Sequence, residues 1–411
     1  MIEEKKTLFS NTVSLYLMNI IRLALPFLTL PYLTRVLSTE SYGLVVYTKA
    51  FLVYVQLVLD FGFLLTATKH IVEANGDYKK IGIITGNTII EKIILGCFSS
   101  LLYLGAVLFT PILSQHFLFC LWYLISIIAS IGVLDFLFRG LEKMHYIVLP
   151  YVVSKAFSTA LIFMYVKSDM DLMYIPQFET MGNVLAAIIS IIIMNRLGIH
   201  IRFGSFGVWI QDLRESGVYF LSNVATTVFG ALTTIIAGWY LSIIHIAYWG
   251  LCMQCLAAAK AMYSPLSNSL YPYMLKSKNI QMLNRLNKYV TVPIVLTTVV
   301  VWNHAFGLMN ILGGVKYIEA GKTLQILLPA FVASYYSMIY GWPVLGAIGK
   351  VKETTATTIF ASCIQLVGIL CLIFLNGFTI ENLAVTCVIS ELFLMVSRFY
   401  LYIKFIQEFQ K

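Results

Sequence analysis

Long apolar stretches fill most of this chain, and short polar segments separate them. A helix needs about 20 apolar residues to cross the hydrocarbon core of a bilayer. Twelve stretches reach that length, so the pattern predicts an all-α polytopic membrane protein with twelve transmembrane helices. The predicted spans are residues 8–33, 42–66, 82–109, 116–138, 147–166, 172–194, 216–238, 246–272, 289–310, 323–347, 354–375 and 381–403.

Composition supports this class and excludes others. Hydrophobic residues make up 59% of the chain, charged residues 11%, and the mean hydropathy is +0.85, far outside the soluble range. The first apolar run is longer than a signal peptide and has no small-residue cleavage site, so we expect a retained span. The seven cysteines all lie in apolar stretches, where we expect packing roles. Cys252 and Cys255 form a C-x-x-C without a second pair, so we expect no metal site and no cofactor.

Basic residues predict the orientation in the membrane. Nineteen of the 28 Lys and Arg residues fall in loops on one side, four fall on the other side, and five lie within spans. The positive-inside rule then places both termini in the cytoplasm, and the formal charge of +9 reports topology rather than nucleic-acid binding. The longest loop, residues 195–215, is basic and amphipathic. We interpret it as a cytoplasmic connector between an N-terminal lobe (1–194) and a C-terminal lobe (216–411), each with six spans.

An internal repeat joins the two halves. Residues 16–38 align without a gap with residues 220–242, and six of the 23 positions are identical. Pro26 aligns with Gly230, and both residue types weaken a helix, which makes them candidate hinges. Six spans separate the copies, so the repeat is parallel. Interrupted helices at corresponding positions of two halves indicate a transport site between them, which predicts an alternating-access transporter.

Basic residues within the spans are candidates for binding substrate. A charge at the bilayer centre costs about 2.5–3.5 kcal/mol, so it faces a partner or a water-filled cavity. Arg22 and Lys260 lie near the middle of their spans and close to the helix breakers Pro26 and Pro265. The candidates for a cationic cavity are Arg22, Lys49, Lys92, Lys155 and Lys260.

Acidic residues within the spans leave two interpretations open. Asp60, Glu91, Glu179 and Glu391 are available to form interhelical ion pairs, which would absorb much of the positive charge. If the cations instead line a wet cavity, they favour an anionic substrate. In that case Asp60 and Glu391 are candidates for binding a coupling proton or sodium ion.

Three stretches carry a resemblance to a known family. NTVSLYLMNIIRLALPFLTLPYLTRVLSTESYGLVVYTKAF (11–51) resembles the opening helices of O-antigen flippases of the Wzx type. FRGLEKMHYIVLPYVVSKAFSTALIFMYVKS (138–168) resembles their fourth and fifth helices, and YPYMLKSKN (271–279) is similar to the loop after their eighth helix. These flippases form a polysaccharide transporter family of the multidrug/oligosaccharidyl-lipid/polysaccharide exporter (MOP) superfamily.

The resemblance implies a fold and a function. The fold is two six-helix lobes, V-shaped around a central cavity lined by helices 1, 2, 7 and 8. The function is to move an undecaprenyl-pyrophosphate-linked oligosaccharide from the cytoplasmic to the periplasmic leaflet of the bacterial inner membrane. Essential cations of related flippases lie on helices 1, 2 and 8, which matches Arg22, Lys49 and Lys260. A polymerase and a chain-length regulator of the same pathway are the implied protein partners.

Two alternatives compete with this interpretation. A drug/cation antiporter of the same fold would rely on acids more than on central cations. A membrane O-antigen polymerase or glycosyltransferase would need catalytic residues on a large outer loop, and the outer loops here are short. The sequence also has no G-x-x-x-x-G-K-[ST] phosphate loop, so we expect a transporter that is neither an enzyme nor directly driven by ATP.

Overall fold

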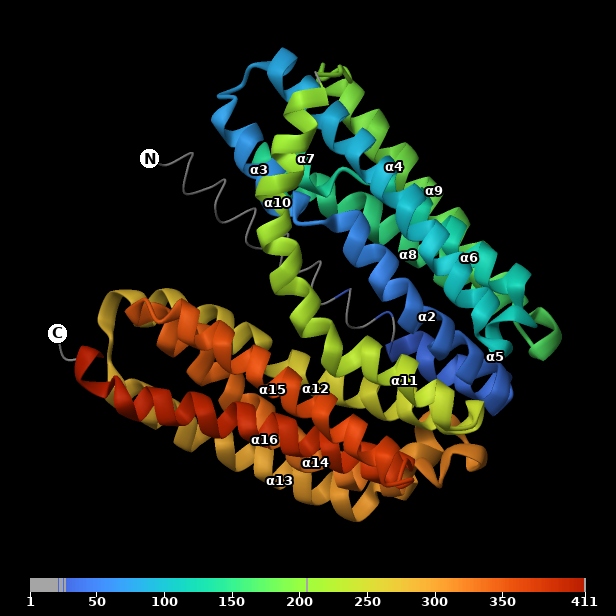
Figure 1. Ribbon diagram of the computed structural model, residues 1–411, viewed down its shortest axis with the longest axis vertical. Helices are drawn as coiled ribbons and strands as arrows, with labels where there is room; N and C mark the ends of the chain where they lie inside the picture. Colours follow the sequence, from blue (N-terminus) through green and yellow to red (C-terminus); the bar gives the residue numbers. More distant parts are fainter. Residues whose placement is uncertain (1–20, 22–24, 26, 205, 410–411) are drawn as a thin grey trace. The chain divides into compact units, whose positions relative to one another are not determined.

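The computed structural model describes residues 21, 25, 27–204 and 206–409 (Figure 1). Over these ranges the chain forms helices joined by short loops, and it contains no strand. Ten helical segments are long and apolar enough to cross a membrane. They coincide with ten of the predicted spans, which confirms the all-α polytopic fold. The predicted span 8–33 lies largely outside the described residues, so the count of twelve stays a prediction.

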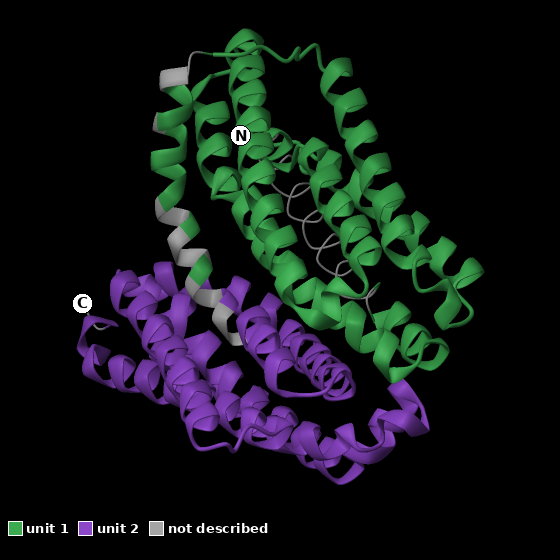
Figure 2. Cartoon of the chain, turned by 45° about the vertical axis from the view of Figure 1, so that its right-hand side comes forward, with its two compact units in different colours: residues 1–224 green, residues 225–411 purple. Residues whose placement is uncertain are grey.

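The chain divides into two compact units, which we call the N-unit (residues 1–224) and the C-unit (residues 225–411) (Figure 2). The N-unit contains α2 (Thr39–Asp60), α3 (Phe63–Glu73), α4 (Tyr78–Phe109), α5 (Pro111–Ser114), α6 (Phe117–Ala129), α7 (Asp135–Gly140), α8 (His145–Tyr165), α9 (Tyr174–Arg196) and most of α10 (Phe206–Thr227).

The C-unit begins with the last residues of α10 and continues through a π-helical turn at Val228–Leu232. Its largest helix contacts are those of α16 with α14 and with α15. The helices that follow the π-turn are α11 (Thr233–Tyr240), α12 (Ile243–Ser277), α13 (Ile280–Gly313), α14 (Ala320–Ile339), α15 (Val351–Phe374) and α16 (Ile380–Lys404).

Helix caps repeat between the two units. Ser38 caps α2 by accepting from the Ser41 backbone N–H, and Ser242 caps α12 by accepting from His245. The two serines lie 204 residues apart, which is the offset of the aligned stretches, and each opens a span of 35 residues. The observed caps therefore support the repeat at the level of local structure.

The segment before α10 lies against α4. The Arg202 backbone N–H donates to the Gly82 carbonyl at 3.1 Å, and a Cβ at Gly82 would lie only 2.2 Å from the His200 carbonyl oxygen. Small residues on α4 thus let a second backbone approach closely. After this segment α10 begins at Phe206 and runs without a break to Thr227, so the predicted boundary between residues 215 and 216 falls inside one helix. The division into lobes at that boundary remains a prediction.

The span that begins with α14 is broken next to a buried arginine. A π-helical turn at Tyr340–Leu345 follows α14, and Gly341 within it has non-helical torsion angles (φ −74°, ψ −116°). The Arg398 guanidinium fills the space beside this glycine, and it donates to the Ser337 carbonyl and to the hydroxyls of Thr357 and Thr358. Neutral acceptors thereby satisfy a buried cation on α16.

Substitution Gly341→Ala should destabilise the C-unit. Its Cβ would lie 2.7 Å from Nη1 of Arg398, and the guanidinium must move and weaken its three hydrogen bonds. We expect a loss of about 1–3 kcal/mol, as for overpacking in other cores, measured by thermal unfolding of the detergent-purified protein. Gly307→Ala on α13 is the matched control, because a Cβ there meets nothing within 4 Å. Equal melting temperatures for the two variants would contradict the role of Gly341.

Candidate functional site

A lysine-glutamate pair joins two helices of the N-unit. Lys49 Nζ on α2 lies 2.8 Å from Glu179 Oε1 on α9. The ammonium also lies 5.4 Å from the centre of the Tyr123 ring on α6, within reach of a cation–π interaction. The pair therefore ties α2, α6 and α9 together at one point within their spans.

A second lysine adds positive charge to this pair. Lys155 on α8 acts electrostatically on Glu179, although it forms no ion pair within 4 Å with any residue whose position is described. Lys49, Lys155 and Glu179 together carry one more positive than negative formal charge. We call these three residues the N-cluster.

The C-unit contains a corresponding pair. Lys260 on α12 forms a short ion pair with Glu391 on α16. Arg398 lies seven residues after Glu391 on α16, and its charge also acts electrostatically on that carboxylate. We call Lys260, Glu391 and Arg398 the C-cluster, which again carries one excess positive charge.

The two clusters use corresponding helices, but their lysines lie at different distances from the start of the helix. Each pair joins the second and the sixth predicted span of its half, with sequence separations of 130 and 131 residues. Lys49 lies 10 residues after the start of α2, whereas Lys260 lies 17 residues after the start of α12. The difference of seven residues is close to two whole helical turns, about 10 Å along the axis. The two lysines therefore project from corresponding faces of α2 and α12.

A third ion pair involves two further candidates. Lys92 Nζ on α4 lies 3.6 Å from Asp60 Oδ1 on α2, and Gln56 donates to the other carboxylate oxygen at 3.0 Å. Three of the candidate lysines are therefore paired with acids, as one of the two sequence interpretations expected. Both candidates for the coupling ion, Asp60 and Glu391, are the partners in such pairs. The proposed roles of all these residues in substrate or ion binding stay predictions.

Of the candidate residues in the aligned repeat, the structure describes Gly230. Arg22 and Pro26 lie outside the described residues. Gly230 lies inside the π-helical turn at Val228–Leu232, and a Cβ there would meet nothing within 4 Å. Local π-turns in helices occur frequently at functional sites. The hinge roles of Pro26 and Gly230 remain predictions.

One buried acid was not given a specific role by the sequence. Glu91 on α4 is 1% exposed, and neither of its carboxyl oxygens has a hydrogen-bond partner among the described residues. Its neighbour Lys92 pairs with Asp60 instead. Successive residues of a helix point about 100° apart, so adjacency in sequence does not make an ion pair.

A charged group near the cytoplasmic end of the predicted topology links α3 to α10. The His70 ring lies 3.3 Å from Glu215 and 3.6 Å from Asp212. Burial raises the pKa of Asp212 above its ordinary value, the facing His70 opposes this rise in pKa, and the carboxylate of Glu215 adds to it. The signal in the sequence was weak, because His70 and the two acids are more than 140 residues apart.

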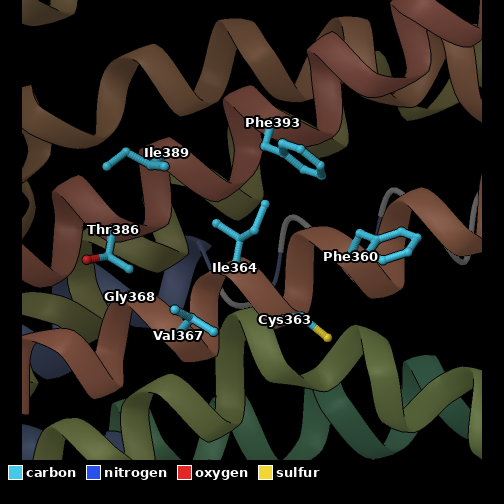
Figure 3. A pocket seen from close by; sticks show the side chains of 8 residues that line it. All are labelled: Phe360, Cys363, Ile364, Val367, Gly368, Thr386, Ile389 and Phe393. Atoms are coloured by element: carbon cyan, nitrogen blue, oxygen red, sulfur yellow. The ribbon is translucent and has the colours of Figure 1, made fainter.

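An apolar groove lies between α15 and α16, and it has a volume of about 360 Å³ (Figure 3). A Cβ at Gly368 would lie 2.3 Å from the Thr386 side chain, so the glycine allows the two helices to pack closely. None of the residues that line the groove is charged, so it provides no anchor for an anionic head group. Its principal side chains are Phe360, Ile364, Val367, Thr386, Ile389 and Phe393.

Removing one partner of the C-cluster pair should destabilise the protein. Lys260→Met leaves Glu391, whose side chain is 8% exposed, without its cation. We expect a loss of about 3 kcal/mol, at the lower end for a buried pair because Lys260 remains 35% exposed. The double variant Lys260→Met/Glu391→Gln should regain most of this loss in a thermal-unfolding cycle.

The pair Lys322–Glu381 provides the control for this cycle. Its atoms lie 3.2 Å apart, but Lys322 is 65% exposed, so Lys322→Met should change stability by less than about 1 kcal/mol. If the two lysine substitutions have equal effects, the Lys260–Glu391 pair is not a buried contact of the folded protein.

Comparisons with known proteins agree with this architecture. A family model described as polysaccharide biosynthesis protein matches residues 8–278. Two curated relatives carry the name "Putative O-antigen transporter". The protein of Escherichia coli (strain K12) is 25% identical over 410 residues, covering 96% of this chain and 97% of its own length. The protein of Shigella dysenteriae is 26% identical over 378 residues, covering 89% and 93%.

Solved structures share the fold. An inward-facing multidrug resistance MATE family transporter of the MOP superfamily superposes with a TM-score of 0.68, covering 95% of this chain and 98% of its own. Its sequence identity is 14%, so the likeness concerns the fold alone. The family match spans well over half of the chain. This chain therefore belongs to the polysaccharide biosynthesis protein family and has the helical fold of the MOP superfamily.

Proposed function

We propose that the protein is a membrane transporter that flips undecaprenyl-pyrophosphate-linked O-antigen, or a related oligosaccharide repeat unit, from the cytoplasmic to the periplasmic leaflet of the inner membrane. The observation that carries the proposal is the similarity to relatives named for O-antigen transport over almost the full length of both chains. In this proposal both termini are cytoplasmic, and a polymerase and a chain-length regulator act on the delivered unit.

The charge clusters suit an anionic head group. A pyrophosphate cannot cross a low-dielectric region without counter-charges. The N-cluster and the C-cluster each offer one excess positive charge within the spans, and their glutamates satisfy the lysines when no phosphate is bound. An arriving phosphate would take the place of a glutamate at its lysine. The lysine then exchanges a glutamate partner for a phosphate partner, and its charge is not left unpaired in the bilayer.

Breaks in the helices suit alternating access. The π-turn that contains Gly230 follows α10, which leads from the N-unit into the C-unit. A second π-turn at Tyr340–Leu345 interrupts a span inside the C-unit. Backbone torsions absorb movement most readily at such breaks, so these turns are the places where we expect bending during transport.

The acids in both clusters favour one second candidate, a drug/cation antiporter of the same fold. Glu179 and Glu391 would then bind a cationic substrate or coupling ion. The excess positive charge of both clusters disfavours this function, because each glutamate already pairs with one lysine and is acted on electrostatically by a second cation.

Arg22→Ala should abolish flipping without preventing membrane insertion, because it removes the candidate cation of the first predicted span. A deletion strain should lose surface polysaccharide and accumulate lipid-linked repeat units, and wild-type protein should restore display. Arg22→Ala should fail to restore it at normal abundance, measured by surface polysaccharide and by extracted lipid-linked units. Arg196→Ala at the end of α9 is the control and should restore display.

Two outcomes would contradict the proposal in different ways. Normal display by the Arg22→Ala strain at native expression would exclude the cavity role of Arg22. Single repeat units attached to the mature acceptor in the deletion strain would show that delivery is intact, and they would favour the polymerase alternative.

A further inference from the structure

Glu91 lies where an ionised carboxylate is unfavourable. It is thirteen residues after the start of α4, about 20 Å along the helix axis. Only 1% of its surface is exposed, and no described donor reaches either carboxyl oxygen. A buried carboxylate without donors pays a large desolvation penalty, so the side chain holds a proton in this state.

Charged groups on the elements around α4 are engaged with one another. From α2, Asp60 pairs with Lys92 of α4. From α3, His70 contacts both acids of α10, Asp212 and Glu215.

The other described elements around α4 provide no cation that pairs with Glu91. α5 and α6 contain no charged residue, and Arg202, in the segment before α10, is exposed. Among the described residues no cation pairs with Glu91, and Asp212 is the charged group of α10 that acts on it electrostatically. Glu91 is therefore positioned to exchange a proton rather than to hold a fixed ion pair.

Titratable groups on α3 and α10 form a series of decreasing exposure, and Glu91 is less exposed than any of them. Side-chain exposure falls from 40% at Glu215 to 23% at His70 and 17% at Asp212, and then to 1% for Glu91. His70 contacts both Glu215 and Asp212, so it bridges the wetter acid to the drier one. The order of burial gives a direction, from solvent to the interior of the N-unit.

The contact between α4 and α10 lies one turn from Glu91. Asn87, four residues earlier on α4, accepts from the Gly204 backbone N–H at 2.8 Å and from Trp209 Nε1 at 3.0 Å. Both donors belong to the start of α10 or to the segment before it. If Glu91 loses its proton, the carboxylate needs a new donor or water, and the Asn87 amide is one helical turn away. Ionisation of Glu91 would thus disturb the contacts that hold this end of α10.

We propose that Glu91 is a proton-binding site, loaded through Glu215, His70 and Asp212, whose protonation state controls the contacts between α4 and the start of α10. The Glu215 carboxyl gives its proton to the neutral His70 ring and becomes ionised. The imidazolium of His70 then gives one proton to the Asp212 carboxylate and becomes neutral again. The Asp212 carboxyl then gives that proton to an intervening water molecule, which passes one proton to the Glu91 carboxylate, and Asp212 becomes ionised again. α10 continues from the N-unit into the C-unit, so a proton that changes its contacts with α4 would influence both units.

The first test follows the carboxyl group itself. Full-length protein in lipid nanodiscs is studied by infrared difference spectroscopy during a pH titration, without any lipid-linked substrate. Wild-type protein should show a protonated-carboxyl band that disappears at high pH, and Glu91→Gln should lose that band. Glu40→Gln, on the exposed first turn of α2, should keep it. An unchanged band in Glu91→Gln overturns the proton site.

The second test follows the route and does not need the Glu91 variant to fold. After a jump to high pH, Asp212→Asn should slow the loss of the carboxyl band by about a hundredfold, as expected when a positioned proton-transfer group is removed. Trp209 fluorescence should change together with the band, and the change should be absent in Trp209→Phe. An unchanged rate in Asp212→Asn overturns the relay. Neither readout uses the oligosaccharide, so failure here is distinct from failure of the proposed flippase function.

Discussion

Desolvation of charge is the constraint on which the rest of this structure depends. A charge left unsatisfied within a bilayer-spanning helix is costly, and the described residues show two ways of satisfying one. Lys49 and Lys260 meet glutamates from a distant helix of the same unit. Arg398 donates its hydrogen bonds to neutral acceptors, and that solution requires a broken helix and a glycine beside it. Each solution joins helices that are far apart in sequence. The charges that make membrane insertion costly therefore also determine which helices pack together.

The same constraint separates the features that could be predicted from those that could not. Span positions follow from hydropathy and length along one segment, so ten of the predicted spans match observed helices. The caps at Ser38 and Ser242 are also local signals, and their shared offset supports the repeat. The continuity of α10 past residue 216 was missed, because an amphipathic segment leading into an apolar one has no break signal in its sequence.

Partner choice within the membrane was the part the sequence left open. Lys49 meets Glu179 from 130 residues away, and nothing in the local pattern selects Glu179 over Asp60. Lys92 stands next to Glu91 in sequence and still pairs with Asp60, because helical geometry turns neighbouring side chains to different faces. Helix faces can be read from a sequence, but the rotation and depth of one helix against another depend on packing across the whole unit. Roles that depend on pairing therefore needed three-dimensional information.

The two clusters also show how the halves of a duplicated fold diverge in the position of one ion pair. Each cluster joins the second and the sixth predicted span of its own half. The lysine of the C-cluster nevertheless lies two turns further along its helix than the lysine of the N-cluster. In the proposed orientation both helices begin at the periplasmic side, so each cluster lies at its own depth along its own helix. A retained helix pair with a shifted lysine is what duplication followed by divergence produces, because a shift of seven residues keeps the side chain on the same face of its helix.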